Sequence, residues 1–251
     1  MSSPETQAGD VGRLAELEAA LADKERQLEL KEQELASLYA SLIHGLDTPL
    51  EVHRELIAQL TSGIGGGLSD EQRGYLALIE KHGLRLRACL EGLQEWWGLR
   101  MPGASLERDD GSLLQLVHRV TAEFEVEAAM RNIALDVELP PSLAPVRFHA
   151  AKLAQALATL VENALHVSPR NAHVVVRVVP SASEVAIDVD DSGPGVPDED
   201  RERIFEPFER PGHGLGLGLA LSREYLRLHG GDVELHHRPE GGSRFRLRLP
   251  R

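Results

Sequence analysis

The stretch "HAAKLAQALATLVENALHV" at residues 149–167, together with the two segments that follow it, decides the fold. Its apolar residues recur every three or four positions, which is typical of one face of a helix. "HVVVRVVP" at 173–180 and "EVAIDVDD" at 184–191 are short and rich in β-branched residues, which predicts two strands. Strands adjacent in sequence, with helices grouped between them, indicate an α+β two-layer sandwich and disfavour a doubly wound α/β sheet.

The same mixed pattern extends over residues 110–251, which we expect to form one domain. We predict two further helices and three further strands from the periodicity of the apolar residues. The helices are expected over 113–130 and 218–230, and the strands over 133–139, 232–238 and 243–250.

The N-terminal third has a different composition, rich in Leu, Ala, Glu and Lys. Residues 1–10 are predicted to be disordered. After them a leucine recurs at every seventh position, which predicts a coiled coil within a first segment, residues 1–33. The repeating residues are Leu14, Leu21, Leu28, Leu35 and Leu42. A single long solvated helix is the alternative interpretation.

A helical hairpin is expected over residues 34–105. "SLIHGLDTPLEVHRELI" at 41–57 reads as an amphipathic helix in which His44 points away from its leucines. "TSGIGGGLSDEQ" at 61–72 breaks this helix, and Ser69 with Gln72 forms a capping box that starts a second one. Two such helices leave too much apolar surface exposed, so we predict a homodimer that closes a four-helix bundle.

The overall composition restricts the classes of partner. The chain has 251 residues and a net charge of −13, which disfavours nucleic acid as a partner. No apolar run approaches the roughly 20 residues that a membrane span requires. A single cysteine suits a reducing compartment, so we expect a cytoplasmic protein. If it senses something across a membrane, the sensor would be a separate sensor protein.

Two glycine clusters are candidates for binding chemistry. "DDSGPGVP" at 190–197 follows a predicted strand, and "PGHGLGLGLALS" at 211–222 opens a predicted helix. Glycines at the start of a helix let backbone N–H groups approach phosphate oxygens. The second cluster is not a Walker A loop, because no Gly-Lys-Ser/Thr follows it, and neither cluster suits a dinucleotide-binding fold.

The order of these motifs resembles the catalytic core of a sensor histidine kinase, and the resemblance covers about residues 34–251. The motifs that carry it are "HGLDTP" (44–49), "LVENAL" (160–165), "DSGPG" (191–195), "IFEPFER" (204–210) and "GLGLGLAL" (214–221).

The resemblance implies that residues 110–251 bind ATP, with the fold shared by gyrase and MutL. Asn163 would coordinate Mg²⁺, and Asp191 would accept a hydrogen bond from the adenine amino group. Gly193 and Gly195 would let the chain pass close to the base. His166 stands where a lysine usually reaches the phosphates, which predicts a modest affinity for ATP.

The resemblance also assigns the lid of the nucleotide site. Gly214, Gly216 and Gly218 would form its hinge and present N–H groups to the phosphates. The lid is very short, and Arg210 is the best available cation for the γ-phosphate.

By the same resemblance, His44 would attack the γ-phosphate of ATP, and a response-regulator receiver domain would then take the phosphoryl group on an aspartate. Gly45 departs from the family, which usually has an acidic residue directly after the histidine. Asp47, at i+3, is a candidate replacement, although it is equally well explained as a solvated surface charge. Thr48 matches the position that orients water in dephosphorylation. Pro49 would supply the helix kink that the family places after the histidine.

We therefore expect an ATP-dependent protein-histidine kinase of a two-component system. The alternative is a pseudokinase or phosphatase-type regulator, which Gly45 and the short lid favour. An ATPase of the gyrase or MutL type is a third possibility, which the histidine motif on a dimerising helix opposes.

Overall fold

The protein was analysed as a computed structural model, which describes residues 4–63, 66–101, 103–209 and 216–251. For part of the first helix, including His44, the description is limited to the helical backbone. Contacts divide the chain into two compact units, residues 1–87 and 88–251. Among the described residues, no helix combines the length and apolar character that crossing a bilayer requires.

Helix α1 (Pro4–Thr61) forms most of the first unit. It includes residues 4–10, which were predicted to be disordered; residues 1–3 of that segment lie outside the described residues. Proline is favoured at the first position of a helix, because the N–H that it lacks would have no partner there. The helix also continues through Pro49 without ending.

Helix α2 (Asp70–Arg100) begins after a glycine-containing turn, and its start confirms the predicted capping box. The Ser69 N–H donates to Gln72 Oε1 at 2.9 Å, and the Gln72 N–H donates to Ser69 Oγ at 3.2 Å. The turn itself depends on Gly66, whose φ of +102° favours glycine. Both helices of the expected hairpin are thus formed, whereas a separate domain over residues 34–105 and the four-helix bundle stay predictions.

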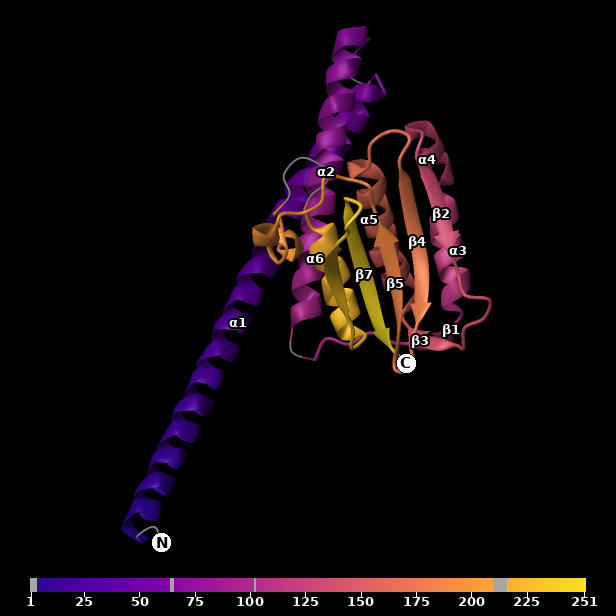
Figure 1. Cartoon of the computed structure of the whole chain (residues 1–251). Coiled ribbons are helices and arrows are strands. Elements are labelled where there is room, and N and C mark those ends of the chain that lie inside the picture. Colours follow the sequence, from indigo (N-terminus) through magenta and orange to yellow (C-terminus); the bar gives the residue numbers. More distant parts are fainter. Residues whose placement is uncertain (1–3, 64–65, 102, 210–215) are drawn as a thin grey trace. The chain divides into compact units, whose positions relative to one another are not determined.

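The second unit contains a five-stranded sheet of order β2-β4-β5-β7-β6 (Figure 1). The strands β2 and β4 are parallel, and every other pair in the sheet is antiparallel. The bounds are β2 (Ala134–Glu138), β4 (His173–Pro180), β5 (Glu184–Asp190), β6 (Asp232–His237) and β7 (Ser243–Pro250).

Helices cover one face of this sheet, which confirms the predicted α+β architecture (Figure 1). Helix α5 packs against β4 and β5, and α6 packs against β6 and β7. The core between the layers is fully buried, as at Leu157, Ile187 and Leu247. The helices are α3 (Leu113–Glu123), α4 (Glu125–Arg131), α5 (Ala150–Val167) and α6 (Gly218–Leu228).

Several short elements were not predicted. The expected helix over 113–130 is two helices, α3 and α4, divided at Phe124, where the backbone N–H bonds to the Thr121 carbonyl. The remaining short elements are β1 (Asp109–Gly111) paired with β3 (Val146–Phe148), and the 3-10 turns η1 (Asp198–Asp200) and η2 (Arg203–Phe205).

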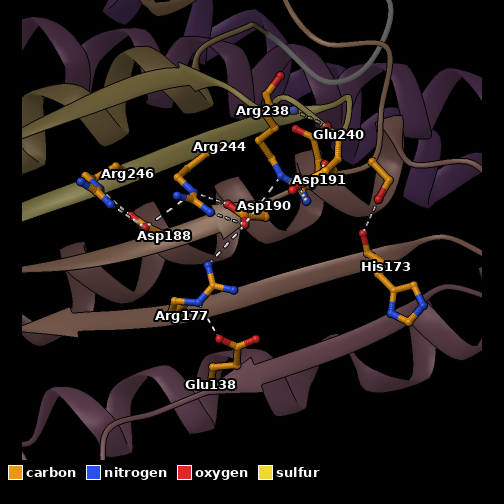
Figure 2. Close-up of polar contacts among 12 residues, drawn as sticks. Glu138, His173, Arg177, Asp188, Asp190, Asp191, Arg238, Glu240, Arg244 and Arg246 are labelled. Atoms are coloured by element: carbon orange, nitrogen blue, oxygen red, sulfur yellow. Dashed lines mark hydrogen bonds and ion pairs between the residues drawn. The ribbon is translucent and has the colours of Figure 1, made fainter.

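The outer face of the sheet, opposite the helices, carries a layer of ion pairs (Figure 2). Alternation along β5 sends Asp188 and Asp190 to this face, yet the two residues are only 1% and 2% exposed. Arg246 of β7 forms two hydrogen bonds with the Asp188 carboxylate, each 2.7 Å long. The long arginine side chains therefore bury the aspartates and neutralise them at the same time.

Candidate nucleotide-binding site

A cavity of about 410 Å³ lies between the C-terminal half of α5, the chain following β5 and the start of β7. This volume is within the usual range for small-molecule sites. Ten residues line it: Asn163, His166, Val167, Asp191, Pro194, Gly195, Val196, Glu209, Ser243 and Phe245. Four of them, Asn163, His166, Asp191 and Gly195, were predicted as site residues from the sequence.

The Asp191 carboxylate is held in a fixed position at the wall of the cavity. Asp191 directly follows β5 and is 2% exposed. Its Oδ1 accepts the N–H of Gly193 at 2.8 Å and the N–H of Ser243 at 3.1 Å. Backbone donors that point at one carboxylate oxygen stabilise the charged form and fix its direction. The site thus presents an oriented hydrogen-bond acceptor to whatever occupies the cavity.

Helix α5 supplies the opposite wall through Asn163 and His166. These residues are three apart, so they lie on the same side of the helix. The intervening Ala164 and Leu165 are buried in the core, which fixes the rotation of the helix. The helix ends at Val167 and is capped by Ser168, whose Oγ accepts the Ser192 N–H at 3.1 Å and so ties α5 to the chain after β5.

The first glycine cluster fits this site because its chain passes close to α5. A Cβ on Gly193 would lie 2.7 Å from Val167 Cγ2, so a larger residue would push the chain away from the helix. Gly195 has a φ of +78°, a conformation that L side chains rarely adopt. Both glycines are therefore required by the path of the backbone.

The second glycine cluster lies against α5 and the segment after η2. The Phe208 N–H donates to the Gly216 carbonyl at 2.9 Å. Gly218 opens α6, and a Cβ there would lie 2.7 Å from Thr159 Cγ2. Neither Gly216 nor Gly218 is among the residues that line the cavity. Arg210 and Gly214, predicted for the lid, lie outside the described residues.

The candidate phosphoacceptor residues lie on α1, in the other unit. Asp47 and Thr48 are exposed, and the side chain of His44 is outside the described residues. Pro49 cannot donate a hydrogen bond to the carbonyl four residues earlier, which is that of Gly45. Apart from its chain neighbours and the adjacent helix backbone, no described atom lies within 4 Å of a Cβ placed on Gly45, so packing does not demand a glycine there.

Sequence reasoning missed several residues of the cavity, notably Ser243 and Phe245. Their strand was predicted correctly from its alternation, but the order of strands in the sheet was not. Only that order shows that the first residues of β7 lie beside the end of β5. Glu209 was also missed, although it lies in the quoted motif "IFEPFER".

Comparison with known proteins assigns the domain that holds this cavity. Residues 149–251 match the family described as histidine kinase-, DNA gyrase B- and HSP90-like ATPases. Sensor protein DivL of Caulobacter vibrioides is 30% identical over 245 residues, or 96% of this chain. The histidine protein kinase DivJ of the same organism is 29% identical over 86% of this chain. Residues 149–251 belong to this ATPase family, and most of the chain is similar to sensor histidine kinases.

Solved histidine kinases share the fold. The catalytic domain of ThkA is 29% identical, with a TM-score of 0.54 over 58% of this chain and 98% of that domain. ShkA in complex with AMPPNP has a TM-score of 0.73 at 24% identity, over 85% of this chain and 45% of ShkA. The chain spans only 31% of the length of DivL and 37% of the length of DivJ.

Proposed function

We propose that the protein is an ATP-dependent protein-histidine kinase that phosphorylates itself on His44 and passes the phosphoryl group to an aspartate of a response-regulator receiver domain. The observation that carries this proposal is the oriented Asp191 carboxylate at the wall of the cavity. A fixed acceptor in a small-molecule cavity suits the 6-amino group of adenine, a hydrogen-bond donor where guanine and hypoxanthine carry an oxygen acceptor.

The lining residues fit the remainder of the nucleotide. Gly195 and His166 line the cavity, and Gly193, which holds the chain against α5, would help to bring it close to the base. The phosphates would extend toward the second glycine cluster, where Gly214, Gly216 and Gly218 would supply backbone N–H groups and Arg210 a positive charge. A histidine in place of lysine is a weaker phosphate ligand, so we expect rapid exchange of ATP.

Magnesium would be held by Asn163 together with the oxygens of the nucleotide. The described residues contain no group of three or more His, Cys, Asp and Glu side chains that could hold a metal by itself. Mg²⁺ is commonly bound in this way, by few protein oxygens and by substrate phosphates. When bound, the ion would neutralise negative charge on the phosphates during transfer.

The phosphoacceptor chemistry depends on a neutral imidazole. His44 Nε2 would form a bond with the γ-phosphorus as the bond to the ADP oxygen breaks, and Nδ1 would then release its proton to a base. Gly45 offers no carboxylate for this step. Asp47, one turn further along α1 and exposed, is the nearest acidic candidate in sequence.

The first unit supports a homodimer as the active form. In the single chain, an apolar groove of about 590 Å³ lies between α1 and α2. It is rimmed by large apolar residues that stay strongly exposed, including Leu46 (46%), Leu78 (52%) and Leu86 (49%). Surfaces of this kind are usually covered by a partner, and a second hairpin would complete a four-helix bundle.

A response regulator is the proposed second partner. ThkA, which is similar to this chain, has been solved in complex with the response regulator protein TrrA. The experiment that tests the proposal is incubation of the wild type and a His44→Ala variant with γ-labelled ATP and Mg²⁺. We expect label in the wild type alone, stable in alkali and lost in acid. Label that survives in His44→Ala, or none in either protein, would contradict autophosphorylation at this residue.

One observation favours the alternative, a regulator that removes phosphate from its partner. Gly45 deprives His44 of the adjacent acid without any steric reason in the described contacts, while Thr48 is retained. This function predicts that the protein, without phosphate on His44, dephosphorylates a phosphorylated receiver domain. It also predicts that Thr48→Ala abolishes this activity.

A further inference from the structure

Arg238 is on the turn that joins β6 to β7, and its side chain reaches the backbone of Asp191 (Figure 2). Its Nη1 donates to the Asp191 carbonyl oxygen at 2.6 Å. Its Nη2 donates to Glu240 Oε2 at 3.2 Å, and its Nε lies 3.8 Å from Asp190 Oδ2. The guanidinium thus connects the Asp191 carbonyl and the buried Asp190 carboxylate with the exposed Glu240 carboxylate, and its planar fork suits such bridging better than an ammonium group would.

The turn that carries Arg238 also holds the backbone of Asp191. The Asp191 N–H donates to the Ser243 carbonyl at 2.9 Å. Gly242, with a φ of +82°, passes so close that a Cβ there would lie 2.1 Å from the Asp191 carbonyl oxygen. Both polar groups of the Asp191 backbone are therefore fixed from the β6–β7 side.

The residue before Asp191 is fixed by the ion pairs of the outer face. Arg244 Nε and Nη2 donate to the two oxygens of Asp190 at 2.6 and 2.8 Å. Burial alone would raise the pKa of Asp190, but the hydrogen bonds and charge of Arg244, together with the charges of Arg238 and Arg177, lower it. Asp190 is thus held in its charged form, and both Arg244 and Arg238 interact with its carboxylate.

We infer that Arg238 is a positioning residue that aims the Asp191 carboxylate at the adenine amino group. The inference rests on the proposed nucleotide site. Arg238 does not line the cavity, so it would act through Asp191. If it were lost, the Asp191 carbonyl would lose a charge-assisted hydrogen bond and the carboxylate would lose part of its fixed direction. Selectivity for adenine should suffer most, because it depends on that direction.

The test compares ATP with inosine triphosphate, in which an oxygen replaces the adenine amino group. Dissociation constants of both nucleotides would be measured by calorimetry for the full chain and for Arg238→Gln. We expect Arg238→Gln to weaken ATP binding by roughly three- to tenfold, the equivalent of one hydrogen bond. Binding of inosine triphosphate should stay nearly unchanged, so the preference for ATP falls. Arg238→Lys keeps a charged donor but loses the planar guanidinium. It should therefore retain more of the preference for ATP than Arg238→Gln does.

Arg246→Gln is the matched control. Arg246 is on the same face and pairs with a buried aspartate, Asp188, but it contacts neither Asp190 nor Asp191. It should lower the melting temperature about as much as Arg238→Gln while keeping the preference for ATP. Asp191→Asn should abolish the preference, and adding Arg238→Gln to it should change nothing further.

The possible results separate the two proposals. A wild type that binds neither nucleotide would overturn the proposed function, and this inference with it. A wild type that prefers ATP, with the same preference in Arg238→Gln, would overturn the inference alone. An equal loss of preference in Arg246→Gln would also overturn it, because the effect would then be general destabilisation of the sheet.

Discussion

His229 accepts the backbone N–H of His149 at Nε2, over 2.9 Å, and thereby joins the end of α6 to the start of α5. Its Nδ1 lies 2.6 Å from the Tyr225 carbonyl oxygen and must therefore donate the hydrogen of that bond. The geometry requires a neutral imidazole with the proton on Nδ1. A protonated ring would present a second N–H to the His149 N–H, and the bond between the helices would be lost.

This relationship predicts that the second unit loses stability in mild acid. Burial lowers the pKa of His229; the Tyr225 carbonyl opposes this shift, and the charges of Arg108 and His149 add to it. The unfolded chain therefore takes up the proton first. The free energy of unfolding should be greatest at pH values above about 6.5, the ordinary pKa of histidine. At lower pH it should decrease by up to about 1.4 kcal/mol per pH unit.

Denaturant titrations at several pH values between 5 and 8 would check this. Both tryptophans of the chain, Trp96 and Trp97, lie in the second unit, so their fluorescence reports on its unfolding. His229→Gln should flatten the pH dependence, while the same change at the exposed His236 should leave it intact. If the unfolding free energy of His229→Gln changed with pH as steeply as that of the wild type, His229 would not be the cause of the acid sensitivity.

Two adjacent glycines allow backbone strain to be separated from a steric clash. Gly241 and Gly242 have φ values of +94° and +82°, so alanine is strained at both. A Cβ on Gly241 meets no described atom within 4 Å, whereas one on Gly242 would overlap the Asp191 carbonyl. Gly241→Ala should lower the free energy of unfolding by about 1 kcal/mol.

Gly242→Ala should cost more than Gly241→Ala, by roughly 2 kcal/mol or more, and should also weaken ATP binding. Tryptophan fluorescence in denaturant and nucleotide calorimetry would measure the two effects. Equal costs for the two variants would mean that the turn can move away from Asp191.

The buried ion pair between Asp190 and Arg244 should matter far more than an exposed one. Asp190→Asn would leave Arg244 and Arg238 beside a neutral amide, and we expect a loss of roughly 2–4 kcal/mol in unfolding free energy. Arg244 is about a third exposed, which favours the lower part of this range.

Asp70→Asn is the reference, because the Asp70–Arg73 pair is exposed on α2. Asp70→Asn should lower the free energy of unfolding by less than about 1 kcal/mol. The two variants would be compared by calorimetric unfolding at low and at high salt. A salt-sensitive, small effect at Asp190 would show that the pair behaves as a surface contact.

Restoring an acid after His44 should increase autophosphorylation. The space around Gly45 accepts a side chain within the described contacts, so Gly45→Glu should fold. We expect a rate increase of at least about tenfold, less than the roughly hundredfold that a positioned base often contributes, because Asp47 would already supply part of this role.

Gly45→Ala is the matched control, since alanine also adds about 1 kcal/mol of helix propensity but carries no carboxylate. Initial rates of phosphohistidine formation would be compared for the two variants and for Asp47→Asn. Equal rates in Gly45→Ala and Gly45→Glu would assign any gain to helix stability. A normal rate in Asp47→Asn would exclude Asp47 as the replacement.

Local patterns were enough to predict the larger elements. The Ser69–Gln72 capping box and the strand over 243–250 were predicted to the residue. Three-residue strands such as β1 and β3 are too short to show a period. The split at Phe124 was hidden because apolar residues continue across it, and tertiary packing overrides helix propensity at such points.

Only part of the candidate site was predicted, because some of its residues come together only through the pairing of strands. Asp191 and Asn163 lie in motifs that can be read locally. Ser243 and Arg238 contact Asp191 only because β7 pairs with β5, and the pattern of one strand does not specify its neighbour. The burial of Asp188 also depends on that pairing, because an aspartate in an alternating strand looks solvent-exposed until arginines of the next strand cover it.

The position of β7 has a consequence for the newly made chain. This strand lies between β5 and β6 although it follows every other strand along the sequence. While residues 243–250 are still inside the ribosome, β6 has no partner in the sheet and Asp191 lacks the N–H of Ser243. The proposed affinity for ATP should therefore arise only after β7 has joined the sheet, and a chain truncated before Ser243 should not bind the nucleotide.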